Sequence, residues 1–143
     1  MENSQVDLRR HNHCVRRSVW HIEWCTKYRY KMMRKLENRN LVAACIRQAA
    51  HRHGIALLAL EVMPEHVHSV AELPKGTDEV RAAKLLKGSS SRKIFQVKEK
   101  FQLRYPKKRF WSRGYMARTI GLDEEKAIRY VRNQQAHHNV TFL

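Results

Sequence analysis

The chain has 143 residues, of which 29 are Lys or Arg and 13 are Asp or Glu, so its formal net charge is +16. Such a charge opposes folding by self-repulsion and therefore favours a polyanionic partner, with nucleic acid ahead of an anionic membrane surface. No apolar run approaches the roughly 20 residues that cross a bilayer, and no apolar signal segment lies near the first residue, so we expect neither a membrane-spanning nor a secreted protein. Three cysteines without a Cys-x-x-Cys spacing indicate thiols in a reducing compartment.

The first part of the chain predicts a lead-in followed by one domain. We expect residues 1–17 to form a basic, mobile lead-in and residues 18–143 a single domain. Residues 18–28 alternate between apolar and polar side chains, which predicts a first strand with one apolar face. Its apolar face would carry Trp20, Ile22, Trp24 and Tyr28, and its polar face His21, Glu23, Cys25 and Lys27.

The middle of the chain predicts a helix and two strands. Residues 38–53 have apolar side chains at helical spacing, and Gly54 is well placed to end the helix. The apolar run 55–62 predicts a buried strand, and a tight connection around Pro64 leads to a strand over 66–73.

The last part predicts two further helices around a fourth strand. Thr77 is the expected N-cap of a helix that runs to about Val97, and residues 88–91 would break it, bend it or mark a close backbone approach. Residues 110–119 predict the fourth strand. A final helix would open at Asp123 and end near His137.

This order of elements predicts a ferredoxin-like, RRM-like α+β fold: a four-stranded antiparallel sheet (βαββαβ) with two helices on one face. The final helix is additional to that plan, carries the tyrosine Tyr130, and is free to cover the open face. In this topology the first and third strands are central neighbours, so the polar face of the third strand lies beside Glu23.

Two histidines on the third strand, His66 and His68, are separated by one residue and share a face. Such a pair can hold a divalent metal, although by itself it is more often a surface pair. Tyr130 and Gln134 lie four residues apart and therefore project from one side of the final helix. Gln134 offers an amide oxygen as a third ligand, a set that favours Mg²⁺ or Mn²⁺, and Tyr130 offers a phenol that can attack a phosphate.

Four stretches together resemble the single-tyrosine HUH transposases of the insertion-sequence 200/605 group. Met63-Pro64-Glu65-His66-Val67-His68 resembles the HUH motif of that family, although Glu65 stands where the family usually has Asp. Trp24-Cys25-Thr26-Lys27-Tyr28-Arg29 resembles the end of its first strand. Trp111-Ser112-Arg113-Gly114-Tyr115 and Tyr130-Val131-Arg132-Asn133-Gln134 resemble its fourth strand and catalytic helix. The resemblance covers about residues 18 to 138.

The resemblance implies a prokaryotic, cytoplasmic enzyme that associates with the nucleoid when it acts. It would cut single-stranded DNA next to hairpins at the ends of a mobile element, form a 5′-phosphotyrosine bond and rejoin the strands by the reverse reaction. It also implies a homodimer, in which the tyrosine helix of one subunit can complete the two-histidine site of the other.

Other side chains are interpreted from their chemistry. The basic residues expected to contact phosphates are Lys27, Arg29, Lys107, Lys108 and Arg109, each of which can also be a solvated surface charge. Glu23 would hydrogen-bond a metal-bound imidazole or pair with a nearby Lys. The rings of Tyr28, Trp111 and Tyr115 can stack on bases or serve the fold.

Two other functions fit the same sequence. A non-catalytic module that binds single-stranded nucleic acid would use the same sheet, but it leaves His66, His68, Tyr130 and Gln134 without a common role. A host-adopted relative that acts on repeated hairpin sequences would share the chemistry and differ in its substrate.

Overall fold

The protein is described by a computed structural model that covers residues 17–120 and 124–142, with side chains as far as Asn133. The expected lead-in over 1–17 therefore lies outside the described residues except for Arg17. The Arg17 guanidinium pairs with Glu72 at 2.9 Å and with Glu124 at 2.8 Å, so it joins the third strand to the start of the last helix.

The described elements follow the predicted order and confirm the predicted fold class. The strands are β1 (Ser18–Cys25), β2 (Ala56–Val62), β3 (His66–Leu73) and β4 (Met116–Thr119), and the α-helices are α1 (Leu36–Arg52), α2 (Glu79–Val97) and α3 (Glu124–Phe142). Two 3₁₀ turns, η1 (Lys27–Arg29) and η2 (Glu99–Leu103), stand between them. The strands form one antiparallel sheet in the order β2-β3-β1-β4. β1 and β3 are thus the central neighbours, as expected.

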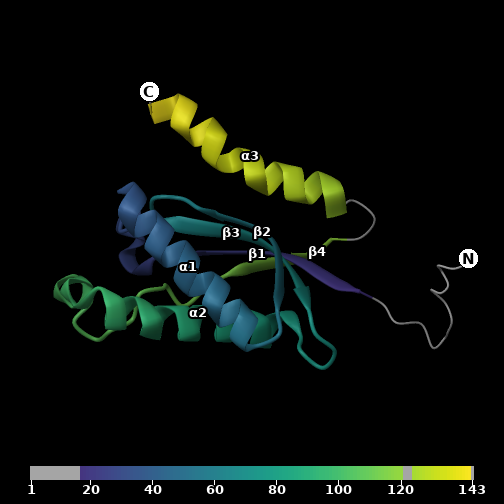
Figure 1. Cartoon of the computed structure of the whole chain (residues 1–143), viewed down its shortest axis with the longest axis horizontal. Coiled ribbons are helices and arrows are strands. Elements are labelled where there is room, and N and C mark those ends of the chain that lie inside the picture. Colours follow the sequence, from purple (N-terminus) through teal and green to yellow (C-terminus); the bar gives the residue numbers. More distant parts are fainter. Residues whose placement is uncertain (1–16, 121–123, 143) are drawn as a thin grey trace, which may run out of the picture.

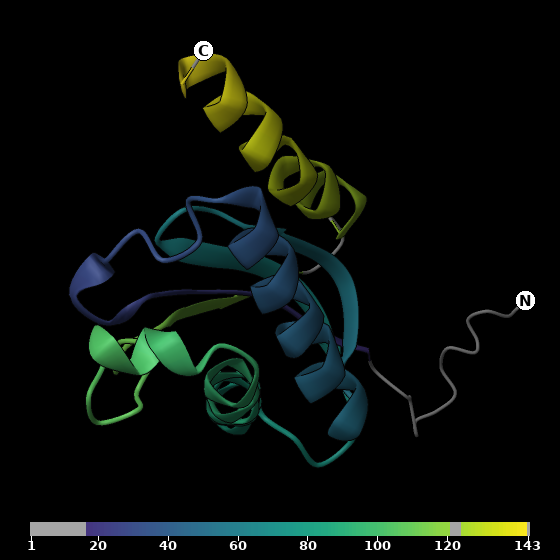
Figure 2. The same ribbon diagram turned by 60° about the vertical axis from the view of Figure 1, so that its left-hand side comes forward.

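The two faces of the sheet are covered by different helices. α1 and α2 lie on one face and α3 lies on the other (Figures 1 and 2). The main core forms between the sheet and α1 and α2, where Ile22, Trp24 and Val67 are at most 2% exposed. Strand alternation sends the neighbouring polar side chains to the opposite face. A smaller apolar cluster holds α3 there, and it consists of Val19, Ala59, Val70 and Val131.

Strand register fixes which polar side chains meet under α3. Glu23 of β1 lies opposite His68 of β3, and Cys25 lies opposite His66. On the other side of β3, Glu61 of β2 also lies opposite His68. Because paired residues in an antiparallel ladder point to the same face, this row gathers two carboxylates around one imidazole.

The predicted first and fourth strands are too long. β1 ends at Cys25, and the backbone at Tyr28 adopts φ 62°, so the Tyr28 ring leaves the apolar face and is 66% exposed. β4 starts at Met116; before it, Trp111 makes an isolated bridge to Thr26. The predicted strand over 110–115 is wrong because groups in this segment bond to side chains of α2 instead of extending a ladder: the backbone N–H of Phe110 donates to Ser91, and Lys87 donates to the carbonyls of Arg113 and Gly114.

The helices and β2 also differ in detail from their predictions. Gly54 ends α1 with φ 71°, as expected, but α1 begins at Leu36. Asp78 caps α2 instead of Thr77, and its carboxylate accepts a hydrogen bond from the backbone N–H of Arg81. The serine stretch does not break α2, and α3 extends past His137 to Phe142. β2 is less buried than predicted because it is an edge strand.

Within the described residues, no helix combines the length and the apolar character that a membrane crossing requires.

Ser90 joins α2 to the segment before β4. Its hydroxyl accepts a hydrogen bond from the indole N–H of Trp111 at 2.9 Å and donates one to the carbonyl of Lys87, and the Ser90 side chain is fully buried. We predict that Ser90→Ala lowers the free energy of unfolding by about 1–3 kcal/mol, because the buried indole N–H loses its partner. Urea denaturation measures this, with the exposed α2 residue Gln96→Ala as control. A loss no larger than that of the control would contradict the prediction.

Candidate active site

The two histidines at the start of β3 converge on one point. Their rings are nearly perpendicular, and the Nε2 atoms of His66 and His68 lie 3.1 Å apart. Two imidazole nitrogens that bind one metal at about 2.1 Å and at right angles are about 3 Å apart. The pair therefore has the spacing of two adjacent ligands of a divalent metal.

Each of these imidazoles has a carboxylate near its other nitrogen. The Nδ1 of His66 lies 2.9 Å from Oε1 of Glu65, and the Nδ1 of His68 lies 3.6 Å from Oε2 of Glu23. Burial raises the pKa of the Glu65 carboxyl, but the hydrogen bond to His66 and nearby charges, including Arg29, bring that pKa below its ordinary value. A carboxylate at Nδ1 keeps the proton on that nitrogen, so that Nε2 is the unprotonated nitrogen, which is the form that binds a metal.

His21 of β1 is a third imidazole in the site, and the sequence assigned it no role. Its Nε2 lies 3.4 Å from Nδ1 of His68 and 3.9 Å from Oε2 of Glu23. Ligand atoms of these three side chains all lie within 4.8 Å of one another, so they form a His-Glu-His cluster that could hold a metal. Burial lowers the pKa of His21, which favours the neutral imidazole that metals bind. The position of His21 two residues before Glu23 was the signal available in the sequence.

The cluster gives His68 two possible metal-facing sides. Its Nε2 faces His66, whereas its Nδ1 faces His21 and Glu23. The Nε2 atoms of His66 and His68 are closer together than Nδ1 of His68 is to His21. A metal bound by these Nε2 atoms would also leave a carboxylate near Nδ1 of each histidine. Glu61, opposite His68 in the ladder, is a further carboxyl of this face, and burial raises its pKa against the opposing effect of nearby arginines.

Tyr130 stands beside this cluster on α3. Its ring centroid is 6.4 Å from that of His21, with the rings close to perpendicular, and the side chain is 51% exposed. The next residue, Val131, is fully buried against the sheet, which fixes the rotation of this part of α3. Gln134 lies one helical turn further along α3, but its side chain lies outside the described residues, so its role as a ligand stays a prediction.

The predicted phosphate contacts surround the end of the sheet where β1 stops and β3 starts. Lys27, Lys107 and Arg109 line a cavity of about 460 Å³ together with the exposed Tyr28. Arg109 and Lys108 also line a neighbouring cavity of about 820 Å³.

The sequence left undecided whether Tyr28, Trp111 and Tyr115 stack on bases or serve the fold, and the structure shows the surroundings of the first two. The indole of Trp111 is buried and packs edge-on against that of Trp24 at 5.8 Å, so it serves the fold. Tyr28, in contrast, is exposed beside Lys27. A hydrogen bond from the buried Tyr105 hydroxyl to the carbonyl of Lys27 at 2.7 Å holds this loop in place, and burial raises the pKa of Tyr105 to about 12.

Comparisons with known proteins show the family to which this chain belongs. Residues 14–134 match the family "Transposase IS200 like". The transposase for insertion sequence element IS200 of Salmonella typhimurium is 27% identical over 115 residues, which cover 80% of this chain and 75% of that protein. The ISDra2 transposase TnpA of Deinococcus radiodurans is 26% identical over 116 residues, which cover 80% of this chain and 82% of that protein.

Solved structures share the fold. The crystal structure of a proposed transposase from Deinococcus radiodurans superimposes with a TM-score of 0.69 at 27% identity and covers 88% of this chain and 97% of that one. The structure of a REP-associated tyrosine transposase bound to a REP hairpin has a TM-score of 0.59 at 17% identity, covering 91% of this chain and 72% of that one. The match over residues 14–134 includes both histidines and Tyr130, and the protein belongs to the IS200-like transposase family.

Proposed function

We propose that this transposase cleaves and rejoins single-stranded DNA through a 5′-phosphotyrosine intermediate on Tyr130. The observation that carries the proposal is the position of Tyr130, in ring contact with His21 beside the converging pair of His66 and His68. Membership of a transposase family and the net charge of +16 support a DNA substrate. Together they give one surface a nucleophile, a set of metal ligands and a polyanionic partner.

The reaction is a transesterification. The phenol oxygen of Tyr130 attacks the phosphorus, a new O–P bond forms, and the bond from phosphorus to the 3′ oxygen breaks. The proton lost by the phenol is balanced by the proton that the leaving 3′ oxygen gains. Because the phosphotyrosine keeps the energy of the broken phosphodiester, a free 3′-OH can reverse the step and rejoin strands without an external energy source.

The sheet face under α3 carries His21, Glu23, His66 and His68, and we refer to it as the histidine face. These residues fit a divalent metal. His66 and His68 would bind it through Nε2, with Gln134 as the proposed third ligand and Mg²⁺ or Mn²⁺ as the proposed ion. A bound metal would polarise the scissile phosphate and orient it toward the tyrosine. Glu65 would keep Nδ1 of His66 protonated, and Glu23 would act in the same way on His68 from a longer distance.

We further propose that the substrate carries hairpins at the element ends and that the protein acts as a homodimer. The REP-associated transposase with the same fold was solved with a hairpin. The C-terminal half of α3 diverges from the sheet of its own chain (Figures 1 and 2), which leaves that half for a second subunit. Tyr130, in contrast, contacts His21 of its own chain, which favours catalysis in cis.

The metal proposal predicts selective loss of Mn²⁺ binding. His66→Ala and His68→Ala should each abolish the high-affinity site in an electron paramagnetic resonance titration. Glu65→Gln should weaken it by about 10- to 100-fold, because the imidazole loses its hydrogen-bonding carboxylate. His51, an exposed histidine of α1, supplies the control His51→Ala. Unchanged affinity in His66→Ala, or an equal loss in the control, would show that the metal binds elsewhere.

The nucleophile proposal predicts that Tyr130→Phe loses cleavage of hairpin-flanked single strands by at least about 1,000-fold, as expected when a nucleophile is removed. Binding of the strand should stay within about twofold. Tyr115→Phe is the matched control, since Tyr115 is also partly exposed and contacts Lys87. Gel assays of labelled strands measure both quantities. A strand bound tightly by the wild-type chain but never cleaved with Mg²⁺ or Mn²⁺ would instead support a non-catalytic binding module.

The cis arrangement predicts the outcome of a mixing experiment. Tyr130→Phe and His66→Ala proteins are inactive for different reasons, so a mixed dimer contains one intact tyrosine and one intact histidine pair on different chains. If Tyr130 serves its own chain, a mixture co-refolded from the two variants should cleave no faster than either variant alone. Recovery of about a quarter or more of the wild-type rate would show that the tyrosine acts on the partner's histidines.

A further inference from the structure

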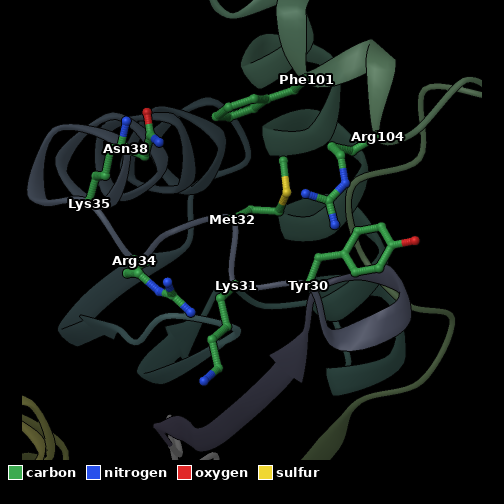
Figure 3. Close-up of a pocket in the computed structure, with 8 residues that line it drawn as sticks. All are labelled: Tyr30, Lys31, Met32, Arg34, Lys35, Asn38, Phe101 and Arg104. Atoms are coloured by element: carbon green, nitrogen blue, oxygen red, sulfur yellow. The ribbon is translucent and has the colours of Figure 1, made fainter. Parts of the chain in front are cut away.

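A basic cavity of about 510 Å³ lies beside the first turn of α1, and we refer to it as the α1 pocket (Figure 3). Its size falls within the range of small-ligand sites. Four of the residues that line it are cations, namely Lys31, Arg34, Lys35 and Arg104, and none of the described lining residues is acidic. Glu37, on the same turn of α1, is already paired with Lys98 at 3.0 Å. The pocket therefore favours an anionic ligand.

The pocket also offers flat apolar surfaces. Phe101 and Met32 line it, as does Tyr30, whose ring carries the guanidinium of Arg104 at 4.1 Å. Tyr30 is itself stacked on Tyr105 with ring centroids 5.5 Å apart, so its orientation is fixed. A ring face next to cations is the combination that binds a nucleobase and its phosphate.

One polar atom of the residues that line the pocket lacks a partner. Oδ1 of Asn38 is buried and, among the described residues, accepts no hydrogen bond. A buried acceptor without a donor is unfavourable, and the exocyclic amine of a base would supply that donor. In the view of Figure 3, Asn38 and Phe101 lie toward one end of the pocket, with Lys35 and Arg104 near them, and Lys31 and Arg34 lie toward the other end. The end that carries the ring suits a base, and the end that carries only cations suits a phosphate.

Hydrogen bonds connect the α1 pocket to the residues that precede His66. The backbone N–H of Met33 donates to the carbonyl of Pro64 at 3.0 Å, and that of Thr26 donates to the carbonyl of Glu65 at 2.9 Å. The Thr26 hydroxyl donates to the carbonyl of Tyr30 at 2.7 Å. The loop that forms the pocket is therefore bonded directly to the turn that presents the histidine pair.

We propose that the α1 pocket binds one unpaired nucleotide of single-stranded DNA, with its base against Phe101 and Met32 and its phosphate on Arg34 and Lys31. The base would donate a hydrogen bond to Asn38. The choice of the cleaved strand as the ligand rests on the proposed function, since that strand passes the turn before His66. The pocket would thereby read a base next to the cleavage site.

The phosphate half of the proposal is tested by binding at several salt concentrations. All measurements use the full-length Tyr130→Phe chain without added metal, so that no strand is cut, and fluorescence anisotropy with a labelled single strand from the gene's flank. Adding Arg34→Ala or Lys31→Ala should each weaken binding about 3- to 10-fold and reduce the salt slope by about 0.7. Lys75→Ala, in the exposed turn at the opposite end of β3, is the control. Losses no larger than that of Lys75→Ala would overturn the proposal.

The base half is tested by an abasic scan. Binding of the Tyr130→Phe chain is measured with a series of strands that each lack one base. Removal of the base at a single position should weaken binding at least about fivefold, as expected for one stacked base. That loss should disappear when Phe101→Ala is added, and also when Phe101→Leu is added, because leucine keeps an apolar side chain against Phe110 but lacks the ring on which the base stacks. A loss that is the same with and without Phe101, or the same pattern in a full duplex, would overturn the assignment.

These measurements separate the two proposals. If the abasic pattern fails while the wild-type chain forms the tyrosine adduct, the α1 pocket is not the nucleotide site and the proposed function stands. If the pattern holds and no adduct forms with any divalent metal, the pocket binds DNA and the proposed chemistry fails.

Discussion

The pairing of β1 with β3 is the constraint on which both the core and the site depend. One register places Glu23 opposite His68 and, by alternation, sends Trp24 and Val67 into the core. A slip by one residue would exchange the two faces, burying the polar side chains and exposing the indole. The register that packs the core therefore also fixes which polar side chains share the opposite face with His66 and His68.

The sequence predicted those parts of the fold that depend on local pattern. β3 was predicted to the residue because alternation is clear and Pro64 precedes it, and its place beside β1 followed from the order of elements. The structure of the segment before β4 was predicted wrongly because it depends on hydrogen bonds to α2. The hydroxyls of Ser90 and Ser91 accept hydrogen bonds from the indole N–H of Trp111 and the backbone N–H of Phe110. Tyr28 was also placed wrongly. Its position fits the alternation of the strand, but its backbone adopts a left-handed conformation outside β1.

The site divides in a similar way. His66, His68 and Tyr130 could be proposed as site residues from spacing and from the resemblance, because each belongs to a short motif. For His21 the signal in the sequence was weak, because its place in the candidate site arises from contacts with His68, 47 residues away, and with Tyr130 on α3. Glu65 departs from the usual Asp of the family, but the longer side chain still reaches Nδ1 of its neighbour His66.

Charge is sorted across the molecule in a way that suits the proposed chemistry. The carboxylates of Glu23, Glu61 and Glu65 lie around the histidines, where they would orient the imidazoles and attract the proposed metal ion. Cations line two cavities in the loops at the end of the sheet: Lys27 and Arg109 line one, and Lys31, Arg34, Lys35 and Arg104 line the α1 pocket. A strand held by those loops would place a phosphate near the metal ligands without bringing it against the carboxylates.

The most direct test of this account is an anomalous diffraction map from crystals of the protein grown with Mn²⁺. The account predicts one manganese peak, bonded at about 2.2 Å to the Nε2 atoms of both His66 and His68, with Tyr130 of the same chain facing it. A peak bonded instead to Nδ1 of His68 together with His21 and Glu23, or no peak on the histidine face, would contradict it.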